Sequence, residues 1–339
     1  MRAPAVSFDH LARLTTADGL YEHAEFTTPR TAHGYCVDDV ARGLVVTSRQ
    51  PSPSEQVAAL TRLYLAFTVD AQEIDGTSHN RRQQDGRWTD EATTGDHWGR
   101  ALWGLGTAAS ARPDDDVREI ALASARVGLQ ARSDHPRAMA YAAIGAAEVL
   151  RAAPGDAAAR SMLRSALSVI GCGSPDPDWP WPQPRLGYAN ALIPEALIVI
   201  GEGLNDGAVL REGLDLLSWL VRMETRGGHL SVTPTGGWGP GDPRPGFDQQ
   251  PIEVAALAEA CFRAREISGD SMWTDALDSC AEWFLGKNDT GLLMYDPDSG
   301  GGYDGLLRDV VNLNQGAEST LAAIATFQLA SLDAFALAR

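Results

Sequence analysis

The sequence predicts an all-α protein with the (α/α)6 toroid fold, in which six inner and six outer helices form a closed double ring. Six segments share one layout, an irregular polar or aromatic loop followed by an apolar helix rich in Ala and Gly. Amphipathic stretches alternate with these segments, and no Ser/Gly-rich linker divides the chain. Inner helices packed on both sides and outer helices with one wet face would produce this alternation. We therefore expect residues 1–339 to form a single barrel domain.

The inner helices are expected in six segments. In the first, Val37, Val40 and Ala41 follow the i, i+3, i+4 spacing of a helix with a buried stripe. In chain order the segments are HGYCVDDVARGLVV, TGDHWGRALWGLG, DHPRAMAYAAIGAAEVL, LGYANALIPEALIVIGEGL, FDQQPIEVAALAEACF and LNQGAESTLAAIATF. The outer helices are expected near residues 5–15, 54–69, 115–131, 156–170, 206–223 and 270–285.

Loop length indicates which end of the ring carries the functional site. Connections from inner to outer helices are short, such as APGD and GLND. Connections from outer to inner helices are long at 18–36, 70–97, 172–192, 224–250 and 287–314, with a short exception near 132–136. Long loops in compact domains usually carry function. We therefore expect a pocket where the inner helices begin, covered by short β-hairpins near residues 228–234 and 291–296.

Composition excludes several classes of function. The formal net charge is -17 and no basic run is present, so no nucleic-acid partner is expected. The four cysteines are far apart without zinc-binding spacing, which predicts buried free thiols and neither a metal nor a cofactor. No stretch approaches the roughly 18 apolar residues of a membrane span, and no signal peptide is recognisable, so we expect a cytoplasmic protein without a membrane partner. The oligomeric state stays open.

The loops at the expected pocket end are rich in flat aromatic side chains, amides and carboxylates. A sugar ring stacks its C–H face on aromatic rings, and its hydroxyl groups bond to planar amides and carboxylates. These loops therefore predict a carbohydrate site. The predicted substrate-binding residues are Asp38, Trp88, Arg137, Trp181, Tyr188, Asn190, Trp238, Gln249, Gln250, Glu253, Tyr303, Asn314 and Gln315.

Four carboxylates are the predicted catalytic residues: Asp39, Asp96, Asp248 and Glu318. Glycoside hydrolases use two carboxyl groups, one of which is an acid with a raised pKa. Crowding of carboxylates beside Asp39 favours that residue as the acid. Asp248, on a Gly/Pro-rich loop, is its expected partner, with Glu318 as the rival.

Plain structural roles compete with these assignments. Glu195, Glu253 and Glu318 lie in the first turns of their helices, where the helix dipole favours a carboxylate. Gln250 and Glu253 also have the spacing of a capping pair. Two further pairs have the i, i+4 spacing of helical ion pairs: Asp38–Arg42 and Asp96–Arg100.

Seven ordered motifs between about residues 30 and 328 resemble the six-hairpin glycosidase-like proteins encoded beside, or fused to, bacterial glycosyltransferases and mannoside-active enzymes. The motifs are GYCVDDVARGL, GDHWGRALWGLG, HPRAMAYAAIG, LGYANALIPEAL, FDQQPIEVAAL, WFLGKND with YDPDSGGGYDG, and NLNQGAESTLA. The resemblance implies the (α/α)6 toroid and carbohydrate-active chemistry. In the fourth segment the family pattern has an acid shortly after the Trp and an Asp before the Asn, where this chain has WPWPQPR and GYAN.

Three functions follow from these observations. The leading expectation is a glycoside hydrolase acting on a small oligosaccharide. A sugar isomerase of the N-acylglucosamine 2-epimerase type, which shares the toroid, is the first alternative. Its chemistry needs two proton-shuttling groups, commonly His, whereas the fifth and sixth inner helices begin with Glu253 and Glu318 and have no His there. The second alternative, a carbohydrate-binding protein without turnover, is favoured by the departure in the fourth segment.

Overall fold

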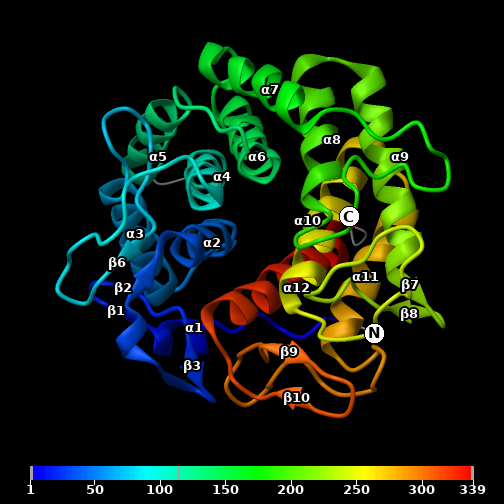
Figure 1. The fold of residues 1–339 in the computed structure, drawn as a ribbon. Helices are drawn as coiled ribbons and strands as arrows, with labels where there is room; N and C mark the ends of the chain where they lie inside the picture. Colours follow the sequence, from blue (N-terminus) through cyan, green and yellow to red (C-terminus); the bar gives the residue numbers. More distant parts are fainter. Residues whose placement is uncertain (1–2, 113–114, 337–339) are drawn as a thin grey trace.

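The structure is a computed structural model that describes residues 3–112 and 115–336. Within these residues, twelve α-helices form two concentric rings, which confirms the predicted (α/α)6 toroid (Figure 1). The inner ring comprises α2 (Val37–Ser48), α4 (Asp96–Ala111), α6 (Pro136–Ala152), α8 (Leu192–Leu204), α10 (Pro251–Ser268) and α12 (Ala317–Ala336). The outer ring comprises α1 (Asp9–Leu14), α3 (Glu55–Asp70), α5 (Asp115–Gly128), α7 (Ala157–Ile170), α9 (Gly207–Glu224) and α11 (Met272–Phe284).

The burial of each helix follows its sequence pattern. In the inner helix α6, every residue from Ala138 to Val149 is buried, because neighbouring helices cover it on both sides. In the outer helix α7, burial is confined to one stripe, which includes Ala159, Leu163 and Ala166. Each inner helix packs against the next one along the chain, and α12 packs against α2. The ring is therefore closed.

Glycines permit the closest approach between inner helices, at the contact between α4 and α6. A Cβ atom on Gly145 would lie 2.4 Å from the backbone oxygen of Leu102. A Cβ atom on Gly106 would likewise lie 2.4 Å from the backbone oxygen of Gly145. Real Cβ atoms do not approach backbone this closely, so the two helices can pack at this distance only with glycine at both positions.

We predict that Gly145→Ala lowers the free energy of unfolding by about 1–3 kcal/mol, the usual cost of overpacking a core. Alanine favours a helix by up to about 1 kcal/mol over glycine, so a net loss would come from the clash and not from helix propensity. Urea denaturation of the variant measures the change. Gly155→Ala, where a new Cβ would meet no atom within 4 Å, is the matched control. Equal stability of the two variants would contradict the close contact.

The described strands are all two residues long and pair as antiparallel ladders. They are β1 (Thr15–Thr16) with β2 (Gly19–Leu20), β3 (Ala24–Glu25) with β4 (Thr28–Pro29), β5 (Tyr35–Cys36) with β6 (Arg81–Arg82), β7 (Thr225–Arg226) with β8 (His229–Leu230), and β9 (Gly305–Leu306) with β10 (Val311–Asn312). All five pairs belong to the long loops that precede inner helices. The β7–β8 pair overlaps the hairpin expected near 228–234.

The hairpin expected near residues 291–296 is reduced to an isolated antiparallel bridge between Tyr295 and Gly302, and the nearest strand pair is β9–β10. Just before this bridge, the Asn288 side chain bonds to the backbone of residues 290–292. Its amide oxygen accepts from the backbone N–H groups of Thr290 and Gly291, each at 3.1 Å. Its amide nitrogen donates to the backbone oxygen of Leu292 at 2.8 Å. The segment is therefore a side-chain-capped turn.

Two expectations from composition can be compared with the described residues. All four cysteines are free thiols; Cys36, Cys261 and Cys280 are buried, whereas Cys172 is exposed. Among the described residues, none of the helices combines the length and the apolar character needed to span a bilayer.

Candidate functional site

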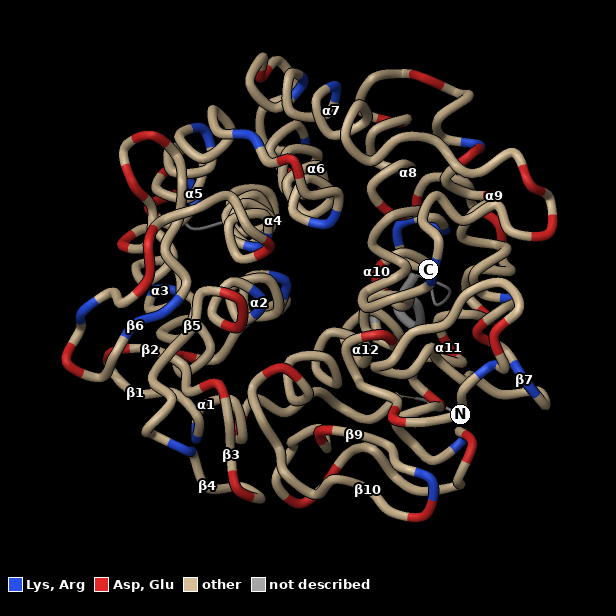
Figure 2. Tube along the Cα trace, in the orientation of Figure 1, with Lys and Arg blue, Asp and Glu red and all other residues tan. Residues whose placement is uncertain are grey.

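A polar cavity of about 550 Å³ lies at the end of the ring where the inner helices begin; we call it the site cavity. Its walls come from the first turns of inner helices and from the loops before them. Figure 2 shows acidic segments at the starts of α2, α4 and α12 around the middle of the ring. The lining residues are Glu22, His23, Asp38, Asp39, Arg42, Asp96, Arg100, Tyr188, Asp248, Gln250, Asp304, Asn312, Gly316, Glu318 and Ser319.

The structure brings all four predicted catalytic carboxylates into this one cavity. Asp39 belongs to the first turn of α2, Asp96 begins α4, and Glu318 belongs to the first turn of α12. Asp248 stands on the loop that enters α10. Three of the predicted substrate-binding residues also line the cavity: Asp38, Tyr188 and Gln250.

The predicted loop tryptophans lie elsewhere, in the hydrophobic core between the loops and the helices. Trp181 is 1% exposed and stacks on Trp219 of α9 with 6.1 Å between ring centroids. Trp88 stacks on His79 at 5.5 Å and lies 5.3 Å from the Phe67 ring of α3, and Trp238 is buried. These rings anchor the long loops to the helical ring. They do not line the site cavity.

Glu253 and Asn190, also predicted to bind substrate, bond to each other and to a loop. The Glu253 carboxylate accepts from the backbone N–H groups of Ala189 and Asn190 and from the Asn190 side chain. Asn190 also donates to the backbone oxygen of Gly187 at 3.2 Å. Burial raises the pKa of Glu253 to about 8. This pair fixes the loop before α8, on which Tyr188 stands.

The amides of the NLNQGAE segment tie α12 to the N-terminal region. The Asn314 side chain accepts from the backbone N–H of Phe26 at 2.9 Å. The Gln315 side chain donates to Asp296 at 2.9 Å, and its backbone N–H donates to the backbone oxygen of Phe26. Neither residue lines the site cavity. The amide side chains of Asn314 and Gln315 therefore join separate loops to the segment before α12.

The remaining predicted binding residues also lie outside the lining of the cavity. The Gln249 side chain donates to the backbone oxygen of Gly246 at 2.8 Å and accepts from Trp283 at 3.1 Å. Tyr303 packs against the hydrophobic core. Arg137 supports the cavity wall from behind, since its Nε donates to the backbone oxygen of Tyr188 at 2.7 Å. Its guanidinium also lies 5.0 Å from the Tyr188 ring centroid.

Two arginines that the sequence suggested as helical ion-pair partners belong to the cavity wall, and their partners differ from those expected. Arg42 pairs with Asp39 at 2.7 Å and with Glu318 at 2.9 Å, so it joins α2 to α12. Arg100 pairs with Asp38, on the neighbouring inner helix. The expected Asp38–Arg42 and Asp96–Arg100 ion pairs do not form, because Arg42 pairs with Asp39 one turn away in α2 and with Glu318 on α12, and Arg100 pairs with Asp38 on α2.

Sequence reasoning missed several other lining residues. Glu22 and His23 come from the loop before β3, where no periodic pattern pointed to a site. Asp304 stands just before β9 and accepts from the backbone N–H of Gly316 at 2.8 Å and from Ser319. The glycine-rich motif GGGYDG, which carries this Asp beside Tyr303, was the available signal for Asp304. For His23 the sequence carried no signal.

Capping does not explain two of the three glutamates at helix starts. Glu253 bonds to the loop before α8, and Glu318 bonds to Arg42. The carboxyl of Glu195 forms no hydrogen bond within the described chain, and burial together with the nearby Glu259 raises its pKa to about 8. Neither Glu195 nor Glu253 bonds to the start of its own helix in the described chain, so the capping alternative is wrong for these two residues.

Asp38 and Asp39 are adjacent in the chain, but their pKa values are shifted in opposite directions. Burial raises the pKa of Asp39 to about 7, against the opposing effect of Arg42. The Cys36 thiol also donates to the Asp39 carboxylate at 3.3 Å. Burial of Asp38 is outweighed by Arg100 and Arg42, which lower its pKa. At neutral pH, Asp38 is ionised and Asp39 can both hold and release a proton.

Asp96 and Asp248 differ from the other cavity carboxyls because their side chains form no hydrogen bond or ion pair with the described residues. One carboxyl oxygen of Asp248 is buried without a partner. Burial raises the pKa of both residues. They also lie across the ring from each other, since α4 and α10 stand on opposite sides of its centre (Figure 1). Both carboxyls are free to engage a ligand.

One cluster of described residues could offer three metal ligands, Glu22, Cys36 and Asp39, whose ligand atoms lie within 4.8 Å of one another. Two arginines already oppose a cation there. Arg81 pairs with Glu22, and Arg42 pairs with Asp39. The charge balance of this cluster does not fit a divalent ion.

No family model and no curated protein matches the sequence. Solved structures do match its fold over nearly the whole chain. A sugar epimerase from a ruminal bacterium superposes with a TM-score of 0.69 at 13% identity, covering 96% of this chain and 95% of that one. For a cellobiose 2-epimerase from Bacillus thermoamylovorans the TM-score is 0.71 at 11% identity, with 97% and 96% covered. For an alpha-amylase from Clostridium perfringens it is 0.62 at 13% identity, with 95% of each chain covered. The chain shares the fold of these three proteins.

Proposed function

We propose that the protein is a carbohydrate-active enzyme that binds a small sugar in the site cavity and isomerises or epimerises it by acid–base chemistry. One observation carries the proposal: two unpartnered carboxyls with raised pKa, Asp96 and Asp248, face one cavity from opposite sides of the ring. The fold supports it, because two of the proteins matched over their whole length are sugar epimerases.

The size and lining of the cavity suit a sugar of one or two units. Its volume of about 550 Å³ lies within the usual range for small-molecule sites, about 300–1,000 Å³. Carboxylates and the Gln250 amide can bond sugar hydroxyls, and Tyr188, which is 41% exposed, offers an aromatic face. The lining arginines, Arg42 and Arg100, are already paired with carboxylates. This charge balance favours a neutral sugar over a phosphorylated or acidic one.

Epimerisation beside a carbonyl group requires a base on one face of the carbon and an acid on the other. The base removes the proton from the open-chain sugar, which leaves an enediolate, and the acid returns a proton to the opposite face. Groups whose pKa lies near the working pH do this best. Asp96 and Asp248 lie on opposite sides of the ring, and burial raises the pKa of each above its ordinary value. Asp39, with a pKa of about 7, is a third group able to exchange a proton in the same cavity.

A glycoside hydrolase is the second candidate, favoured by the number of carboxyl groups in the lining. Seven lining residues of the site cavity carry a carboxylate, whereas His23 is its one histidine within the described chain. Hydrolysis uses one carboxylic acid to protonate the glycosidic oxygen and one carboxylate to activate water or attack the sugar. The same Asp96–Asp248 pair could perform both steps.

Product analysis in heavy water separates the candidates. The purified protein is incubated in D2O with gluco-, manno- and galacto-configured monosaccharides and disaccharides, and products are analysed by chromatography and mass spectrometry. An epimerase or isomerase forms an isomer that gains one carbon-bound deuterium. A hydrolase releases a monosaccharide from a disaccharide without carbon-bound deuterium. Sugar that binds calorimetrically but stays unchanged means a binding protein, and a panel that neither binds nor reacts overturns the carbohydrate proposal.

A further inference from the structure

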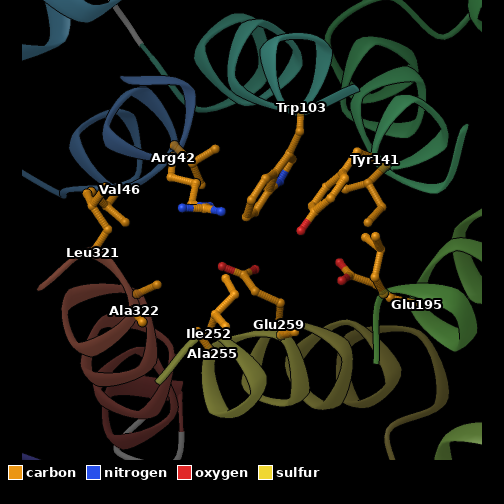
Figure 3. Close-up of a pocket in the computed structure, with 15 residues that line it drawn as sticks. Arg42, Val46, Trp103, Tyr141, Glu195, Ile252, Ala255, Glu259, Leu321 and Ala322 are labelled. Carbon is orange, nitrogen blue, oxygen red and sulfur yellow. The ribbon is translucent and has the colours of Figure 1, made fainter. Parts of the chain in front are cut away.

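A second, smaller space of about 40 Å³ lies on the ring axis beneath the site cavity, and all six inner helices contribute to its walls (Figure 3). We call it the axial chamber and define it by Arg42, Trp103, Tyr141, Glu195 and Glu259, which line it together with aliphatic side chains. Arg42 lines both spaces. It therefore stands between the proposed sugar site and the axial chamber.

Three side chains around the axial chamber carry buried polar groups without a partner among the described residues. The Nε of Arg42 and the indole nitrogen of Trp103 are buried and unbonded. Glu195 is 3% exposed, and its carboxyl group points into the axial chamber (Figure 3). Buried polar groups in folded proteins are almost always bonded to protein or to ordered water. Three such groups around one small space indicate a bound polar molecule.

The size of the axial chamber fits water. A cavity needs at least ~10–15 Å³ of this kind of volume to hold one water molecule, so 40 Å³ has room for one to about three molecules. Each water needs two to four polar partners, and Figure 3 shows four groups directed into the space: the guanidinium of Arg42, the hydroxyl of Tyr141 and the carboxyls of Glu195 and Glu259. Water in the axial chamber could therefore bond to these four groups.

Glu195 is the carboxyl around the axial chamber that lacks a counterion. Arg49 pairs with Glu259 at 2.5 Å, and Arg263 pairs with Glu148. Burial and the charge of Glu259 raise the pKa of Glu195 to about 8, so it is a neutral acid at neutral pH. A neutral carboxylic acid both donates and accepts, which allows it to bond two water molecules. The charged or titratable groups around it are Arg42 and Arg49 from α2, Tyr141 and Glu148 from α6, and Glu259 and Arg263 from α10.

We propose that ordered water in the axial chamber joins Glu195 to Arg42, which makes Glu195 a positioning residue for the site cavity. Arg42 holds Asp39 with one guanidinium nitrogen and Glu318 with the other. Water bonded to the remaining Nε–H fixes the plane of the Arg42 guanidinium, and with it the direction of both ion pairs. Ionisation of Glu195 places a negative charge opposite Arg42 that competes with Asp39 and Glu318. The proposal concerns the free protein and holds whichever sugar reaction is catalysed.

NMR spectroscopy of the sugar-free protein tests the coupling. The Arg42 Nε–H resonance, assigned with Arg42→Lys, is followed against pH together with the side-chain carboxyl carbon of Glu195. We expect both to share a step with a midpoint near pH 8, in addition to an Arg42 step near pH 7 that comes from the bonded Asp39, and only the shared step to be lost in Glu195→Gln. Glu224→Gln is the matched control. Glu224 is another buried glutamate with a raised pKa, about 7, but it lies on the outer helix α9 and bonds to Thr233.

The Arg42 step near pH 8 should persist in Glu224→Gln. Its persistence in Glu195→Gln would overturn the proposal. A crystal structure of the unchanged protein provides a check that does not depend on any variant folding. Ordered water bonded to both Glu195 and the Arg42 Nε–H supports the proposal, and a dry axial chamber refutes it. Since neither measurement uses a sugar, failure here is distinct from failure of the proposed function.

Discussion

Replacing Asp248 by Asn is expected to lower kcat by about 10²–10⁴-fold, the usual contribution of a general acid or base, while the melting temperature stays near that of the unchanged protein. The substitution keeps the shape of the side chain and deletes its titratable proton. Because the Asp248 side chain has no partner in the described chain, no bond that holds the fold is lost. The raised pKa also means that its charge does not stabilise the fold. Steady-state kinetics and thermal unfolding of one preparation give both values.

Asp304→Asn is the comparison that gives this result meaning. Asp304 lines the same cavity but accepts from Gly316 and Ser319, so its replacement should lower the melting temperature. Asp39→Asn is expected to lower both kcat and the melting temperature, because Asp39 is bonded to Arg42 and also has a pKa of about 7. Asp248→Asn with wild-type kcat would remove Asp248 from the mechanism. A loss confined to its melting temperature would assign it a structural role.

The protein is expected to lose several kcal/mol of stability as the pH rises from about 5 to 7, since each buried carboxyl of raised pKa contributes up to about 2 kcal/mol over these two pH units. Four buried carboxyls have a folded-state pKa of about 7 or 8: Asp39, Glu195, Glu224 and Glu253. In the unfolded chain the same groups ionise near pH 4–4.5. Between these limits the unfolded state binds fewer protons than the folded state, so the free energy of unfolding falls as pH rises. The loss is complete once the pH passes the folded pKa values.

Groups with lowered pKa act mainly outside this window. The pKa of Glu148 is lowered to about 2 despite its burial, because Arg263 outweighs that burial, so its stabilising contribution is lost only in acid. His10 opposes the trend, since burial lowers its pKa and its contribution grows as the pH rises towards 6.5. Urea unfolding at pH 5 and pH 7 measures the balance. The urea concentration at the unfolding midpoint should fall as pH rises. Glu224→Gln should reduce the slope of the free energy of unfolding against pH by the equivalent of about one bound proton. A midpoint that rises from pH 5 to 7 would contradict the prediction.

The fold could be predicted because helix periodicity reports burial directly. The continuous small-apolar run of α6 and the single stripe of α7 distinguish an inner from an outer helix without any knowledge of contacts. The carboxylates of the site cavity could be predicted for a related reason. Asp39 and Glu318 each belong to the first turn of an inner helix, and a closed ring brings the starts of its inner helices together at one end.

Loop side chains could not be placed in this way. The same composition serves a ligand pocket or a buried core, and Trp181 packs its loop against Trp219 of α9. Partners far apart in sequence were equally hidden. No local pattern pairs Arg42 with Glu318 or brings His23 from an N-terminal loop into the site cavity. Local spacing suggested i, i+4 ion pairs within single helices, whereas Arg100 bonds to the neighbouring helix and Arg42 bonds both within α2 and across to α12.

Closure of the ring between α12 and α2 has a consequence for the order of events during synthesis. Gln328 of α12 donates to the backbone oxygen of Val46 in α2 at 2.8 Å, and Arg42 bonds Glu318 across the same seam. The ribosome releases α12 after the other five inner helices, so a nascent chain holds α2 and α10 with their apolar flanks uncovered. The site cavity is completed only when this last inner helix docks. A chain halted before α12 lacks Glu318, so Arg42 keeps only its pair with Asp39. Its ring stays open, and the uncovered apolar flanks of α2 and α10 make it prone to aggregation.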